Sequence, residues 1–69
     1  MTDVQTLTSE ARVRKAHRLA AGARERGISA DTAAVLDEQG RVALAGLVGV
    51  RPPSDITWAM TVELLRSVR

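Results

Sequence analysis

The stretch "LVGVRPPSDITW", residues 47–58, decides the fold because it combines a helix stop, a stiff turn and a helix start. Gly49 can adopt the left-handed conformation that commonly ends a helix. Pro52 and Pro53 fix their own φ angles and hold the residues before them extended. Ser54 can cap a new helix, since its hydroxyl can accept a hydrogen bond from a free backbone amide. The stretch therefore predicts two helices joined by a rigid elbow.

The segment after the elbow, residues 54–69, has the clearest helical pattern in the chain. Asp55 lies in its first turn and Arg66 near its end, where their charges suit the helix dipole. One face carries a stripe that we expect in the core, formed by Trp58, Thr61, Val62, Leu65 and Val68. Ile56, Met60 and Leu64 flank this stripe and widen the apolar arc. These three residues are either covered within one monomer or form a protein interface, such as a homodimer seam.

A long helix is also predicted for "TSEARVRKAHRLAAGARERG", residues 8–27, after a flexible N-terminus at residues 1–7. Thr8 or Ser9 can cap its start and Gly27 can end it. Gly22 is expected on the exposed side, where it weakens the helix by about 1 kcal/mol relative to alanine. The side expected to face the core carries Val13, Ala16, Leu19, Ala20 and Ala23. Residues 8–69 are therefore predicted to form a single small domain.

Residues 28–49 allow two interpretations. In the first, Ser29 or Asp31 caps a short helix to about residue 39, Gly40 breaks it, and residues 41–48 form another helix. The apolar positions of this segment recur at near-helical spacing, at Leu36, Ala43, Leu47 and Val50. In the second, "VLDEQGRV" is the turn of a β-hairpin spanning residues 32–46, which gives an α-β-β-α chain. Because the segment is rich in alanine, we predict an all-α domain of three to four helices, with the α-β-β-α arrangement as the alternative.

Length and composition restrict how such a domain is stabilised. The chain has 69 residues, no cysteine, one histidine and one aromatic residue, Trp58. A domain of this size buries only about 60% of its unfolded surface, and small chains often add disulfides, a metal or oligomerisation. Disulfides are excluded, and His17 alone predicts no zinc site. Oligomerisation, for example as a homodimer, is the remaining expectation.

The chain shows no pattern that supports catalysis. His17 is expected on a solvated helix face without a carboxylate partner, and Asp37 and Glu38 are expected in a solvated turn. The glycines do not follow a phosphate-binding or dinucleotide-binding motif. We therefore predict a non-enzyme without cofactor, metal or small-molecule substrate. Without an apolar run of about 20 residues or a signal-peptide pattern, we also predict a cytoplasmic protein with no membrane partner.

Positive charge is concentrated in one segment. The net charge is +2, but six basic and two acidic residues between Glu10 and Arg26 give that segment +4. Arg14, Lys15 and Arg18 lie opposite its apolar side and are candidates for contacts with DNA phosphates. The alternative is an ordinary solvated helix face.

The elbow resembles a known DNA-binding arrangement. Ala45, Gly49 four residues later and the apolar Val50, followed by a capped helix, resemble the helix-turn-helix domains of bacterial and phage regulators over about Arg41–Arg69. The resemblance implies that the small residue lets two helices cross closely, and that the protein is a non-catalytic DNA-binding or regulatory protein. By position in the motif, it implies that Arg51, Ser54 and Thr57 contact DNA.

The outer face of the last helix supports a second function. Its exposed strip is expected to be Asp55, Ala59, Glu63 and Arg66, and acidic groups oppose phosphates. A protein-interaction module that uses Ile56, Met60 and Leu64 is therefore the alternative function.

Overall fold

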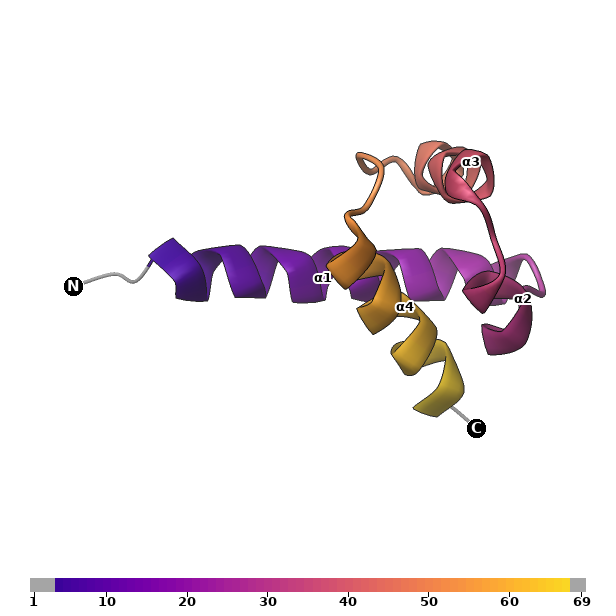
Figure 1. Cartoon of the computed structure of the whole chain (residues 1–69), viewed down its shortest axis with the longest axis horizontal. Coiled ribbons are helices and arrows are strands. Elements are labelled where there is room, and N and C mark those ends of the chain that lie inside the picture. Colours follow the sequence, from indigo (N-terminus) through magenta and orange to yellow (C-terminus); the bar gives the residue numbers. More distant parts are fainter. Residues whose placement is uncertain (1–3, 68–69) are drawn as a thin grey trace.

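The protein is a small bundle of α-helices. The computed structural model describes the backbone of residues 4–67 and the side chains of residues 10–67, so that Val68 of the predicted stripe lies outside the described residues. This part forms α1 (Val4–Glu25), α2 (Ala30–Ala34), α3 (Glu38–Val48) and α4 (Asp55–Ser67). Because no strand occurs within it, the all-α prediction is confirmed and the alternative hairpin at residues 32–46 is wrong. The N-terminal half of the long α1 extends beyond the body that the other helices form around its C-terminal half (Figure 1).

Helices α1 and α4 form the central packed pair. Helix α4 packs chiefly against α1 and also against α2, while α3 packs against α1. Trp58 is 6% exposed, and its indole Nε1 donates a hydrogen bond of 3.0 Å to the carbonyl oxygen of Ala33. Five of the ten buried apolar residues are alanines, so the helices approach closely but bury little apolar area per residue. The core combines Ala16, Leu19, Ala20, Ala23, Ala33, Leu44, Ala45, Trp58, Val62 and Leu65.

The elbow forms as predicted. Gly49 ends α3 with a left-handed φ of 86°, and the N–H groups of Gly49 and Val50 both donate to the carbonyl of Ala45 at 2.9 Å. Ser54 caps α4, because its Oγ accepts a hydrogen bond from the Thr57 N–H at 3.3 Å. However, α3 and α4 pack mainly against α1 rather than against each other. The close crossing implied by the helix-turn-helix resemblance is therefore not the main contact of these helices.

Several helix ends differ from the predicted ones. Helix α1 already begins at Val4, four residues before Thr8. Helix α2 is capped by Ser29 as expected, with its Oγ 3.2 Å from the Thr32 amide, but it ends at Ala34. Gly40 does not break a helix: it lies in the first turn of α3, where its N–H donates to Asp37 Oδ1 at 2.8 Å. Asp37 therefore caps a helix instead of lying in a solvated turn, and Glu38 is that helix's first residue.

The buried faces of two helices match the predicted ones only in part. In α1, the buried side carries Ala16, Leu19, Ala20 and Ala23 as expected. Gly22 is buried, and a Cβ atom there would collide with Cγ2 of Val48, so it marks the close approach of α1 and α3. Val13 was expected in the core but is 43% exposed. In α3, Leu47 is 65% exposed, while Leu44 is buried. The physical reason is that the contact between Gly22 and Val48 sets which side of α3 meets α1.

Candidate functional site

Four basic side chains from α1 and the elbow gather on one face. Arg14, Lys15, Arg18 and Arg51 surround a shallow depression floored by Ala11 and Val50, and we call them the basic cluster. Lys15 Nζ donates to the carbonyl oxygen of Pro52 at 3.3 Å. Because this contact holds the elbow against α1, it brings Arg51 next to cations that lie more than thirty positions earlier in the sequence.

Little negative charge offsets the basic cluster. Arg14 Nη2 lies 3.8 Å from Glu10 Oε2, and both side chains are more than half exposed. Such a solvated pair between residues i and i+4 holds its partners weakly. Within residues 10–67, the cations of Lys15, Arg18 and Arg51 have no carboxylate oxygen within 4.0 Å. The cluster can therefore offer up to four positive charges to an anionic partner.

The two hydroxyl residues expected near DNA do not join the basic cluster. Thr57 is only 3% exposed, and its Oγ1 lies 3.1 Å from Ser54 Oγ. Ser54 is exposed, but its Oγ also accepts the Thr57 N–H as the cap of α4. Burial withdraws Thr57 from any outer surface, and capping occupies the hydroxyl of Ser54. Of the six candidate DNA contacts, the structure brings together only the four cations.

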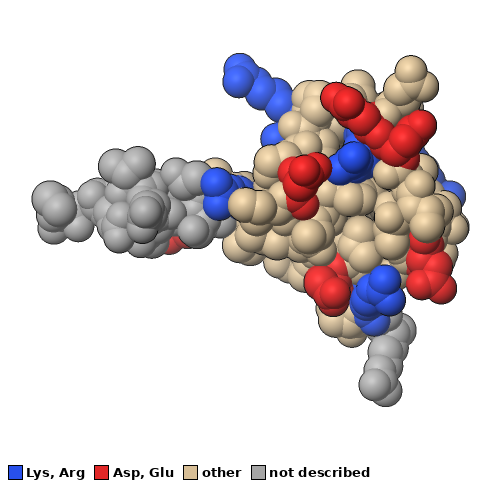
Figure 2. All heavy atoms as spheres, in the orientation of Figure 1, with Lys and Arg blue, Asp and Glu red and all other residues tan. Residues whose placement is uncertain are grey.

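The outer strip of α4 carries the charges expected from the sequence. Asp55, Ala59, Glu63 and Arg66 are all exposed. Arg66 pairs with Asp31 at 3.9 Å, and Asp55 pairs with Arg41 of α3 at 3.1 Å. On the face drawn in Figure 2, acidic and basic groups are interspersed over the helical body. This strip offers few free donors for the edges of bases.

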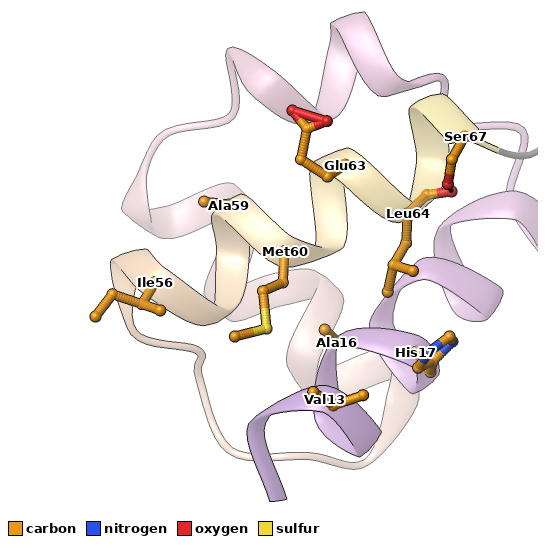
Figure 3. A pocket seen from close by; sticks show the side chains of 9 residues that line it. All are labelled: Val13, Ala16, His17, Ile56, Ala59, Met60, Glu63, Leu64 and Ser67. Carbon is orange, nitrogen blue, oxygen red and sulfur yellow. Dashed lines mark hydrogen bonds between the residues drawn. The ribbon is translucent and has the colours of Figure 1, made fainter. Parts of the chain in front are cut away.

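An apolar groove lies along one side of the contact between α1 and α4 (Figure 3). We call it the α1–α4 groove, and its volume is about 640 Å³. Ile56 is 56% exposed, while Met60 and Leu64 are half-buried, so the monomer does not cover the three predicted interface residues. The α1 wall consists of Val13, Ala16 and His17, and the α4 wall of Ile56, Ala59, Met60, Glu63, Leu64 and Ser67.

Sequence reasoning missed the α1 wall of this groove. It placed Val13 in the core, whereas Val13 is exposed and lines the groove beside Met60 and Leu64. His17 is exposed as expected, but it also lines the groove. The available signal was that Val13 lies at the edge of the apolar side of α1, next to His17 one turn later. A residue at the edge of an apolar stripe lies at the boundary of the core, where it can also line a surface groove.

The described residues were also compared with the requirements of a metal site and of a membrane span. No group of three or more His, Asp or Glu residues within them could hold a metal ion. No helix in this part is both long and apolar enough to cross a membrane. Comparisons with protein-family models, curated proteins and solved structures found no match to this chain.

Proposed function

We propose that the protein binds double-stranded DNA through its phosphates, using the basic cluster. The observation that carries this proposal is the contact of Lys15 with the Pro52 carbonyl, because it adds Arg51 to the cations of α1. Arg14, Arg18 and Arg51 are exposed, so their guanidinium groups can pair with phosphate oxygens. A DNA partner also fits the cytoplasmic, bacterial or phage setting that the sequence suggested.

Binding of this kind depends little on base sequence. A recognition helix presents donors near its N-terminus to base edges in the major groove. Here α4 begins with Asp55, and Thr57 is buried. The elbow therefore positions Arg51 beside α1, whereas α4 contributes side chains to the core and to the α1–α4 groove. We expect contacts to the DNA backbone to dominate.

The number of cations limits the salt dependence. Each neutralised phosphate adds about −0.9 to the slope of log affinity against log salt concentration. Four cations therefore predict a slope of up to about −3.6, so that a fourfold rise in salt weakens binding about a hundredfold. Removal of two cations should bring the slope about 1.8 closer to zero.

The test measures fluorescence anisotropy of a labelled duplex over a range of salt concentrations. The double variant Arg14→Gln/Arg18→Gln should bind more weakly and with a flatter salt slope than the wild type. The matched control, Arg26→Gln/Arg66→Gln, makes the same charge change at exposed arginines outside the cluster and should keep the slope. If the two variants lost the same affinity, or if the wild type showed no salt-dependent binding, the proposal would be wrong.

A further inference from the structure

We infer that the α1–α4 groove is filled by α4 of a second copy of this chain, which makes the protein a two-fold symmetric dimer. Ile56, Met60 and Leu64 follow one another at intervals of four residues and form a ridge along α4. This ridge borders the groove, whose opposite wall contains Val13 and Ala16 (Figure 3). A ridge beside a groove is self-complementary, because a two-fold rotation places each ridge in the other copy's groove.

Helix-packing geometry supports this reciprocal insertion of each ridge into the groove of the other copy. Rows of residues spaced four apart on two helices interdigitate with the axes crossing at about −50°. A two-fold contact also requires that the same patch serves on both copies. Met60 is the middle of the ridge and comes nearest to the symmetry axis, and Ile56 and Leu64 lie on either side of it. Ala59, on the same outer face, leaves room for the partner's helix to approach.

The charges on the groove walls are complementary under the same rotation. Glu63 lines the α4 wall, and within residues 10–67 its carboxylate has no cation within 4.0 Å. His17 lines the α1 wall, and Arg24 of α1 donates to the Leu64 carbonyl at 3.2 Å at the same end of α4. When the ridges exchange, the outer side of each α4 lies under the partner's α1. Glu63 is then brought towards the partner's α1, whose groove side carries His17 and Arg24.

The length and composition of the chain favour a second copy as the occupant of the α1–α4 groove. A domain of 69 residues has a small core, and half of the buried apolar residues here are alanines. The chain has no cysteine with which to add a disulfide. Dimerisation buries the large side chains that the monomer leaves open, Ile56 and Val13 among them. This inference does not depend on DNA binding, since Val13 lies about half a turn of α1 away from Lys15 and Arg18, and Arg14 does not line the groove.

Sedimentation equilibrium from micromolar to millimolar protein concentrations tests the dimer. The wild type should dimerise, and Ile56→Glu should weaken the dimer at least about tenfold, as burial of a charge in an apolar contact requires. The control Leu47→Glu makes the same charge change at a 65% exposed helical position outside the groove, and it should dimerise like the wild type. Arg14→Gln/Arg18→Gln should dimerise normally, so that failure of this inference is separable from failure of DNA binding.

A cross-linking experiment covers the case in which Ile56→Glu does not fold. The chain has no native cysteine, so Met60→Cys introduces a single thiol near the proposed axis and Leu47→Cys places one away from it. Mild oxidation should give a covalent dimer with Met60→Cys much faster than with Leu47→Cys. A wild type that stays monomeric at millimolar concentration, or equal cross-linking of the two variants, overturns the inference. A dimer that Leu47→Glu disrupts and Ile56→Glu does not would also overturn it.

Discussion

Replacement of Gly22 by alanine sets two physical effects of opposite sign against each other. Gly22 lies inside α1, where alanine stabilises an ordinary helix by about 1 kcal/mol relative to glycine. The structure, however, places Val48 of α3 where the new Cβ would go. Valine in a helix has one strongly preferred χ1 rotamer, so its methyl group cannot swing away without strain. The sign of the stability change therefore shows whether α1 and α3 touch at this point.

Overpacking of a core commonly costs about 1–3 kcal/mol. Set against the gain of about 1 kcal/mol in helix propensity, Gly22→Ala should lower the free energy of unfolding by up to about 2 kcal/mol. In a Val48→Ala background the collision is removed, and the same substitution should raise stability by about 1 kcal/mol. The two backgrounds should thus differ by about 1–3 kcal/mol, which is the coupling energy of a double-mutant cycle.

The assay is equilibrium unfolding in urea, followed both by helical circular dichroism and by the fluorescence of Trp58, the only aromatic residue. Coincident curves would support the two-state treatment that the cycle requires. If Gly22→Ala stabilised both backgrounds equally by about 1 kcal/mol, Gly22 would behave as an exposed helical glycine. The close approach of α1 and α3 would then be refuted.

Three further substitutions test the elbow and the core by the same urea unfolding. Trp58→Phe should lower the free energy of unfolding by about 1–3 kcal/mol, because it removes the hydrogen bond to Ala33 and part of a buried ring. The Ala33 carbonyl keeps its hydrogen bond from the Leu36 N–H. Unfolding of this variant is followed by circular dichroism alone, and an unchanged stability would contradict the buried indole. Gly49→Ala should cost about 1 kcal/mol, because alanine is strained at a φ of 86°; an unchanged midpoint would argue against the left-handed cap. Ser54→Ala should cost about 1 kcal/mol through loss of the cap to Thr57, whereas Ser54→Asp, which can still cap, should be nearly neutral.

Local chemistry made the elbow predictable. A glycine that ends a helix and a serine that starts one act through the backbone of their own segment, so their roles at Gly49 and Ser54 do not depend on distant residues. The same reasoning identified Ser29, and applied to Asp37 it would have placed the start of α3 correctly. Gly40 was wrongly predicted to break a helix. Glycine is tolerated in the first turn of a helix when a cap accepts its amide, as Asp37 does for the Gly40 N–H.

Burial of the helix faces could not be predicted in this way. A helical wheel shows which residues share a side, but it does not show which neighbour covers that side. Gly22 appeared exposed because it lies opposite the alanine-rich stripe of α1, yet α3 packs on it. Val13 appeared buried because it belongs to the stripe, yet α4 leaves it 43% exposed in the groove. Both errors concern contacts between residues more than twenty positions apart.

The two proposed surfaces together constrain how the protein would act on DNA. The basic cluster and the α1–α4 groove lie on different sides of α1, so burial of the groove leaves the cations free. In the proposed dimer each copy therefore keeps its own basic cluster accessible, so that one dimer has two DNA-binding sites. We expect such a dimer to join two duplex segments, whereas the monomeric Ile56→Glu variant would bind one segment with the same salt slope. Loss of duplex bridging without loss of binding is therefore the combined signature that separates these surfaces.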